Sequence, residues 1–96
     1  MKAVGYSRAG AVDDDGVLVD VDLPQPELGE NDLLVKVHAV SVNPVDCAIR
    51  ATEHPRAGQP RVLGYDAVGT IVELGSSVED EPLLNHFVVG DRVFYA

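Results

Sequence analysis

Apolar residues recur at every second position in several short stretches of the chain, which is the spacing of β-strands rather than of helices. The pattern predicts a first strand at residues 2–6 and a second at residues 17–23, where Asp20 and Asp22 alternate with apolar residues. Alternation of this kind gives a strand one buried face and one face in water. Pro24 ends the second strand, because proline cannot donate a hydrogen bond to a sheet.

The most strongly predicted strand spans residues 33–42 and runs directly into a helix start. Asn43 suits the N-cap position and Pro44 suits the first helical position, so we expect a helix of one or two turns from Pro44. Residues 51–61 contain two prolines and a glycine, and are predicted to form a loop.

A further alternating stretch follows at residues 64–75, and Gly69 within it predicts a β-bulge or a close approach of another backbone segment. Gly90 and Asp91 predict a turn, and residues 92–96 begin a last strand. No long helical period occurs anywhere in the chain. The sequence therefore predicts a mostly β fold, a small and largely antiparallel barrel with one short helix.

Composition limits the kind of protein. The chain has 96 residues, enough for one small domain, and a formal net charge of −9 from 16 acidic and 7 basic residues. This charge argues against partners such as nucleic acid or an anionic membrane surface, because both attract basic faces. A single cysteine, Cys47, argues against a disulfide framework, and no segment has the length of a membrane span or the apolar core of a signal peptide. We expect a cytoplasmic protein.

The chain stops within the apolar stretch formed by residues 93–96. We therefore expect it to be part of a longer protein; the alternative is that this last strand closes the barrel at the terminus. In the first case, apolar edges are left uncovered, and we expect a homo-oligomer such as a dimer formed through these edges.

Four blocks of sequence occur here in an order that resembles a known superfamily. They are Met1-Lys2-Ala3-Val4, residues 35–46, Gly64-Tyr65-Asp66-Ala67-Val68-Gly69 and Val89-Gly90-Asp91-Arg92-Val93. Together they resemble the N-terminal GroES-like part of the catalytic domain of medium-chain dehydrogenases/reductases, in the quinone oxidoreductase-like branch. That branch includes proteins labelled as zinc-type alcohol dehydrogenases although they lack zinc ligands.

The resemblance implies a two-domain enzyme, of which residues 1–96 are the GroES-like part. The Rossmann cofactor domain of the family is absent from these residues, since no G-x-G-x-x-G turn followed by a helix occurs in them. The implied parent enzyme is an oxidoreductase that uses NADPH, and the 96 residues alone are expected to be inactive.

The resemblance also bears on zinc. Zinc-using members have cysteine at the position of Asn43, an acid three residues later, and Gly-His-Glu in place of Gly64-Tyr65-Asp66. Asn43 and Tyr65 are poor zinc ligands, since zinc prefers thiolate, imidazole or carboxylate, so we expect no zinc. A substitute site built from Cys47, His54 and Asp66 matches no ligand spacing. Cys47 is expected instead to pack as a small apolar residue on the inner face of the helix.

Without a Lewis acid, a carbonyl substrate has to be polarised by hydrogen bonds, which suits quinones and α,β-unsaturated carbonyls. We expect Asn43 and Tyr65 to be catalytic donors, and Asn43, Pro44 and Asp46 to lie against the cofactor. Arg50 and Tyr65 are expected to line the substrate site, with the loop that ends at Arg61 at its entrance. Each has a structural alternative. In these alternatives Asn43 serves solely as the helix cap, Asp46 solely as an acceptor for backbone amides, and Tyr65 solely to fill a pocket.

Two other functions remain open from the sequence. The first is a non-enzymatic binding or scaffold module, since GroES-like barrels also occur in co-chaperonins. The second is a zinc-dependent alcohol dehydrogenase.

Overall fold

The computed structural model describes residues 1–80 and 87–96. His86, for which the surrounding sequence predicts a loop, lies outside the described residues. Strands predominate, so the predicted mostly β fold is confirmed. The chain forms two compact units, one made of Met1–Gln25 and Val42–Tyr65 and the other of Pro26–Ser41 and Asp66–Ala96. Among the described residues, no helix is both long enough and apolar enough to cross a membrane.

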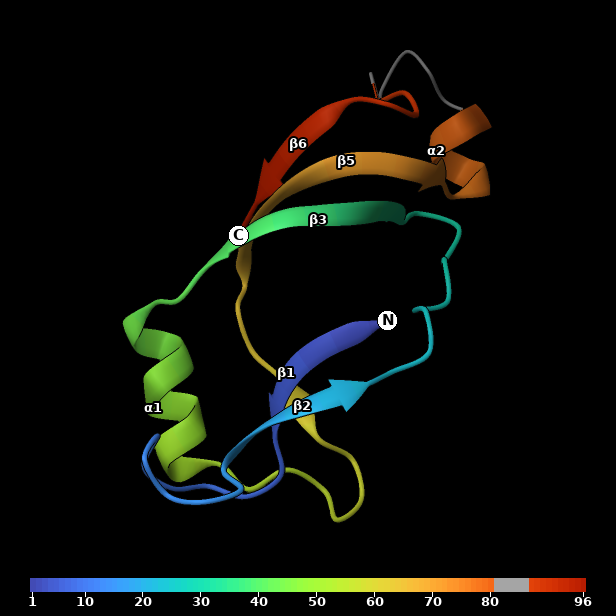
Figure 1. Ribbon diagram of the computed structural model, residues 1–96. Coiled ribbons are helices and arrows are strands. Elements are labelled where there is room, and N and C mark those ends of the chain that lie inside the picture. Colours follow the sequence, from blue (N-terminus) through green and yellow to red (C-terminus); the bar gives the residue numbers. More distant parts are fainter. Residues whose placement is uncertain (81–86) are drawn as a thin grey trace. The chain divides into compact units, whose positions relative to one another are not determined.

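The first unit contains a three-stranded antiparallel sheet in the order β2-β1-β4 (Figure 1). Its strands are β1 (Lys2–Tyr6), β2 (Leu18–Asp22) and β4 (Arg61–Val62). The central strand β1 pairs with β2 along its whole length and with β4 through Gly5 and Tyr6. Tyr6 and Val17 are fully buried and form the core of this unit. A core of only these two fully buried side chains is small, as expected for a unit of this size.

Helix α1 (Pro44–Thr52) belongs to the same unit. Asn43 is its N-cap in an extended conformation and Pro44 is its first residue, as predicted. The helix has nine residues and is slightly longer than expected; Glu53 closes it by donating its backbone N–H to the carbonyl of Ile49 at 2.8 Å.

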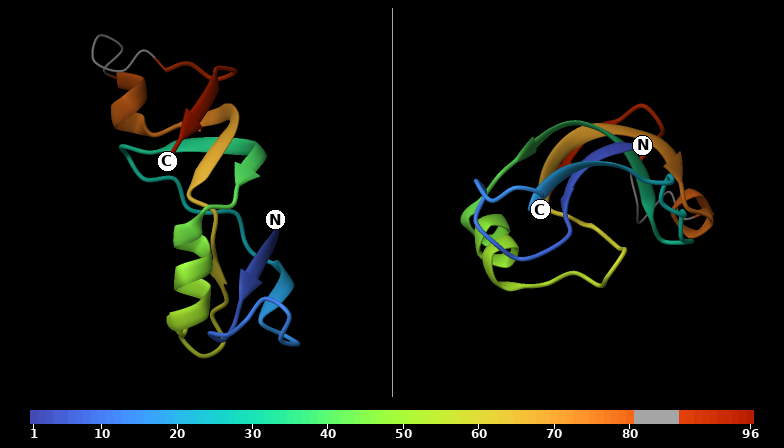
Figure 2. Two further views of the ribbon diagram at one scale, coloured as in Figure 1. Left: turned by 90° about the vertical axis from the view of Figure 1, so that its left-hand side faces the viewer. Right: turned by 60° about the horizontal axis from the view of Figure 1, so that its bottom comes forward.

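The second unit contains another three-stranded antiparallel sheet, in the order β3-β5-β6. Its strands are β3 (Leu33–Ser41), β5 (Asp66–Leu74) and β6 (Arg92–Tyr95), and Figure 2 shows them side by side. The short helix α2 (Ser76–Asp80) follows β5 directly. Ile71 is fully buried and Val78 nearly so, and these two form the core of the unit.

Gly69 lies where β5 approaches β3 most closely. The pairing of β3 with β5 shifts its register between Val37 and Ala39, opposite this glycine. A Cβ atom placed on Gly69 would lie 2.6 Å from Cγ1 of Val35 and closer still to the carbonyl oxygen of Lys36. The irregularity and close backbone approach predicted for this glycine are therefore both confirmed.

Two elements differ from the sequence-based prediction. Arg61 belongs to β4 rather than to a loop, because its backbone pairs with Tyr6. Helix α2 was not predicted at all. Its five residues span little more than one turn, which is too short to display a helical period.

Candidate functional site

The start of α1 is organised around the carboxylate of Asp46, which is only 4% exposed. Its Oδ2 accepts a hydrogen bond from the backbone N–H of Asn43 at 2.8 Å, and its Oδ1 accepts one from the backbone N–H of Gly64 at 3.0 Å. Gly64 has a φ of 96°, which a residue with a side chain rarely adopts. A single buried acid therefore joins the helix start to the segment that carries Tyr65.

Asn43 and Pro44 form the exposed side of this arrangement. Asn43 is half-buried, and its carbonyl accepts the N–H of Asp46 at 3.0 Å, which is the first hydrogen bond of the helix. Pro44 is exposed and lacks an N–H, so it leaves no unpaired donor at this end. Asn43 thus occupies the helix-capping position, which is the structural role that the sequence predicts as the alternative to a catalytic one.

Tyr65 is not buried, and a hydrogen bond to its phenol oxygen holds its side chain. The residue is 42% exposed, and its hydroxyl oxygen accepts a hydrogen bond from Nη2 of Arg61 at 3.1 Å. Nη1 of the same guanidinium donates to Oε2 of Glu53 at 2.7 Å. Both hydrogen bonds raise the pKa of Arg61 above its ordinary value, that to Tyr65 more than that to Glu53, so the guanidinium stays charged.

The sequence placed the loop that ends at Arg61 at the substrate entrance but did not predict the contacts of Glu53 with Arg61 or of Arg61 with Tyr65. Glu53 follows the last residue of α1, and Arg61 was assigned to a loop. The four-residue spacing of Arg61 and Tyr65 is visible in the sequence, but such a spacing brings side chains together only in a helix. The spacing could not be used without knowing that β4 fixes the backbone of Arg61 beside β1.

Arg50, expected to line the substrate site, is engaged with the loop that follows β1. Its Nε donates to the carbonyl of Gly10 at 3.2 Å, and its own carbonyl accepts the N–H of Gly10 at 3.1 Å. Nearby, Nδ1 of His54 accepts the N–H of Ala9 at 3.2 Å. These contacts tie the loop after β1 to the end of α1.

The described residues do not fit a metal centre. No group of three or more His, Cys, Asp or Glu side chains that could hold a metal occurs among residues 1–80 and 87–96. Cys47 is exposed, so the expectation that it packs on the inner face of α1 is wrong. Its neighbour Asp46 occupies the buried position instead, because two backbone amides compensate the buried charge.

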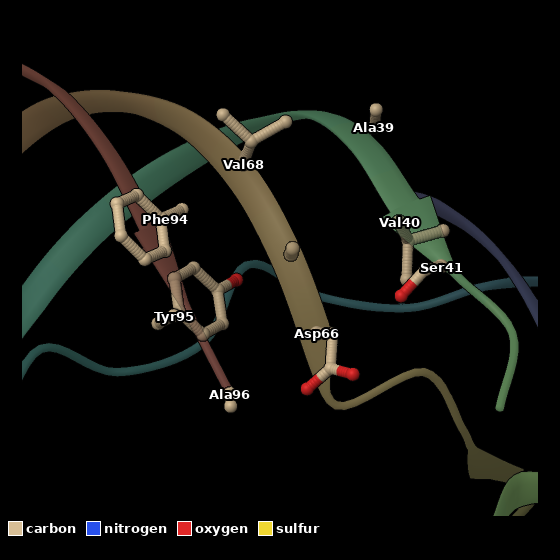
Figure 3. A pocket seen from close by; sticks show the side chains of 9 residues that line it. Ala39, Val40, Ser41, Asp66, Val68, Phe94, Tyr95 and Ala96 are labelled. Atoms are coloured by element: carbon tan, nitrogen blue, oxygen red, sulfur yellow. The ribbon is translucent and has the colours of Figure 1, made fainter.

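A separate hollow lies in the second unit, at the end of β3 and the beginning of β5. Its volume is about 510 Å³, and Figure 3 shows the aromatic side chains of β6 along it. The hydroxyls of Ser41 and Tyr95 and the carboxylate of Asp66 are its polar side-chain groups. The complete lining is Ala39, Val40, Ser41, Asp66, Ala67, Val68, Phe94, Tyr95 and Ala96. Sequence reasoning did not identify this hollow, because it depends on how three strands end beside one another.

Comparison with known proteins places these features in a family context. Residues 29–96 match the family model described as the alcohol dehydrogenase GroES-like domain. The chain is 38% identical over 96 residues to a zinc-type alcohol dehydrogenase-like protein of Staphylococcus aureus (strain MRSA252), covering all of this chain and 26% of the relative. It is 40% identical over 85 residues to the chloroplastic NADPH-dependent alkenal/one oxidoreductase of Arabidopsis thaliana, covering 83% of this chain and 21% of the relative.

Solved structures show the same relationship. A candidate zinc-dependent alcohol dehydrogenase from Rhizobium etli CFN 42 is 44% identical, with a TM-score of 0.86 over 100% of this chain and 26% of that one. The Escherichia coli quinone oxidoreductase, crystallised with NADPH, is 29% identical with a TM-score of 0.79 over 100% of this chain and 27% of that one. The chain therefore spans about a quarter of the length of these proteins.

Proposed function

Because the chain belongs to the alcohol dehydrogenase GroES-like domain family, we propose that it is the N-terminal catalytic part of an NADPH-dependent, zinc-independent oxidoreductase. Its hydride acceptor would be a quinone or an α,β-unsaturated carbonyl. Two relatives support this choice, one by its name as an alkenal/one oxidoreductase and the other as a quinone oxidoreductase solved with NADPH. The activity would belong to the longer protein, and the 96 residues alone would be inactive.

The residues at the start of α1 are the observation on which we propose that the enzyme works without zinc. Both carboxylate oxygens of Asp46 accept backbone N–H groups, and the side chain is buried. Asn43 offers a carboxamide and Tyr65 a phenol at the positions where the resembling zinc enzymes have cysteine and histidine. Zinc prefers thiolate, imidazole or carboxylate, so these residues do not fit a zinc ion.

The same residues suit a carbonyl acceptor polarised by neutral donors. Bound NADPH would supply the hydride, and negative charge would then collect on the acceptor's carbonyl oxygen. The amide of Asn43 and the hydroxyl of Tyr65 are donors that can stabilise this charge where it develops. Quinones and α,β-unsaturated carbonyls need only this help, because conjugation already delocalises the incoming charge onto oxygen.

Asp46 and Pro44 would act by shaping the site. Asp46 holds the backbone of Asn43 and of Gly64, the residue before Tyr65, so it would fix the two segments that carry the donors. Pro44 fixes the first turn of α1 and presents an apolar ring beside Asn43, suited to the nicotinamide. Arg50 would support the neighbouring loop, since its Nε is engaged with Gly10.

The test uses the full-length protein that carries this chain, dialysed against a chelator. NADPH oxidation is measured with 1,4-benzoquinone, with an unsaturated ketone and with the matching saturated ketone. We expect turnover with the first two acceptors, little with the third, and no stoichiometric zinc by elemental analysis. Loss of turnover after chelation, restored by zinc, would contradict the proposal.

A zinc-dependent alcohol dehydrogenase is the second candidate, favoured by the names of the Staphylococcus and Rhizobium proteins. This function predicts bound zinc at one ion per chain and oxidation of simple alcohols that stops when the ion is removed. The chelation experiment therefore separates the two candidates.

Two substitutions then test the donors in the full-length protein. Tyr65→Phe removes only the phenol hydroxyl and should lower kcat roughly 10²-fold, the cost of losing one donor to a developing oxyanion. Asn43→Ser keeps a good N-cap residue while removing the amide, so reduced turnover without unfolding would assign Asn43 to the site. Tyr6→Phe makes the same chemical change at a buried tyrosine and should leave turnover unchanged.

A further inference from the structure

Arg61 connects three segments of the first unit: its own strand, the residue after α1 and the residue Tyr65. It belongs to β4, it contacts Glu53 just beyond the end of α1, and it contacts the phenol of Tyr65. The two hydrogen bonds use different nitrogens, Nη1 at 2.7 Å and Nη2 at 3.1 Å. A planar guanidinium held on two sides has a defined orientation, so it also defines where the phenol oxygen lies.

The direction of the Arg61–Tyr65 hydrogen bond matters for chemistry. A guanidinium has only donors, so the phenol oxygen of Tyr65 has to be the acceptor. The hydroxyl hydrogen of Tyr65 is therefore not used in this contact and can be donated to another molecule. Tyr65 is also 42% exposed, so a ligand can reach this residue from solvent.

We propose that Arg61 is a positioning residue that aims the Tyr65 hydroxyl at the carbonyl oxygen of the acceptor and reinforces it as a donor. This inference rests on the proposed function, and it adds a residue that the family resemblance did not supply. As Tyr65 donates, partial negative charge grows on the phenol oxygen, and the adjacent guanidinium stabilises that charge. Donor strength in such a chain of hydrogen bonds increases cooperatively.

Glu53 has a distinct part in this arrangement. Its carboxylate accepts from Nη1 of the guanidinium, whereas Tyr65 accepts from Nη2, so Glu53 holds the side of Arg61 away from the phenol. The pair is open to solvent, with Glu53 more exposed than Arg61, so its contribution is weakened by screening. Losing Glu53 should therefore loosen Arg61 without removing its charge from the phenol.

The experiment compares Arg61→Gln, Tyr65→Phe and the double variant in the full-length protein with 1,4-benzoquinone as acceptor. Arg61→Gln should lower kcat about tenfold with little change in KM, as expected for losing a charge-assisted hydrogen bond that matters in the transition state. The double variant should match Tyr65→Phe alone, because Arg61 acts through the phenol. Glu53→Gln, the matched control, should lower kcat by less than about threefold.

A second measurement does not depend on activity. In protein labelled with ¹³C at the tyrosine Cζ atoms, the Tyr65 resonance is assigned by its absence in Tyr65→Phe. Arg61→Gln should move this resonance, whereas Asp20→Asn, at an exposed position on β2, should not. A resonance that does not move would overturn the contact, and with it the inference.

The outcomes separate this inference from the proposed function. An active protein in which Arg61→Gln turns over like the wild type, or in which the losses from Arg61 and Tyr65 multiply in the double variant, overturns the role of Arg61 alone. A folded full-length protein that reduces neither quinone nor unsaturated ketone overturns the proposed function, and the inference falls with it.

Discussion

The carboxylate of Asp46 lies 3.0 Å from the backbone nitrogen of Gly64, eighteen residues further along the chain. Its other oxygen lies 2.8 Å from the backbone nitrogen of Asn43. One buried acid therefore sets the geometry of both segments that carry the proposed donors. Asp46 has a structural role at the atoms it contacts, and under the proposed function it would affect the chemistry only through the segments it holds.

Replacing Asp46 with asparagine should destabilise the protein. The substitution keeps the size of the side chain but exchanges one acceptor oxygen for an NH₂ group, which cannot accept. At least one of the two backbone N–H groups then loses its partner in a buried place, at a cost of about 1–3 kcal/mol in the free energy of unfolding. Urea denaturation monitored by circular dichroism measures this loss.

The matched control is Asp20→Asn, which makes the same change at an exposed carboxylate on β2. Its effect should stay within about 0.5 kcal/mol, as is usual for surface substitutions. Equal losses for the two variants would show that the buried hydrogen bonds of Asp46 contribute nothing specific.

Replacing Tyr6 with phenylalanine should leave stability unchanged or raise it. Tyr6 is fully buried, and its hydroxyl has no hydrogen-bond partner among the described residues. Removing a buried polar atom that lacks a partner removes a desolvation cost rather than an interaction. Tyr6→Ala, which also removes the ring, should cost about 3–5 kcal/mol. A clear loss for Tyr6→Phe in thermal unfolding would mean that the hydroxyl is paired in solution.

Local chemistry was enough to predict the strands and the start of α1. The alternation of apolar residues predicted the bounds of β1, the bounds of β3 to within one residue and those of β5 to within two, because alternation is a property of consecutive positions. Asn43 and Pro44 determine a helix start by their own conformational preferences, without help from distant residues. Gly69 likewise predicted that another backbone segment approaches closely, but it did not identify that segment.

Features that depend on distant contacts could not be predicted. The two residues of β4 become a strand only because β1 is available to pair with them. Cys47 was expected to face inward on apolar character alone, but Asp46 takes the buried position since Gly64 provides a second amide for its carboxylate. The Arg61–Tyr65 contact arises in the same way, from side chains whose orientation is set by packing.

Replacing Gly69 with alanine should be more damaging than replacing Gly58. A Cβ on Gly69 meets the backbone carbonyl of Lys36 and Val35 Cγ1, and strand backbone cannot move aside cheaply. We expect a loss of about 1–3 kcal/mol or more from this overpacking. Gly58→Ala meets no atom within 4 Å, and its φ of 75° limits the cost to about 1–2 kcal/mol of backbone strain. Chemical denaturation of both variants gives the comparison, and the reverse order would contradict the close approach.

Strand β6 leads to an expectation about self-association of the 96-residue chain. It pairs with β5 on one side and, among the described strands, with none on the other, and Phe94 on it is 88% exposed. An apolar edge strand invites pairing with a second copy. We expect sedimentation velocity to show a dimer whose fraction rises with concentration. Phe94→Lys should weaken dimerisation at least roughly tenfold, because a charged edge strand resists pairing.

Phe87→Lys provides the control, since Phe87 is 42% exposed and lies outside the strands. It makes the same change in charge and size, so any general effect of added charge on association will appear in both variants. A selective loss in Phe94→Lys would locate the contact at β6. A wild-type chain that stays monomeric at high concentration, or equal behaviour of the two variants, would show that this edge is not where copies meet.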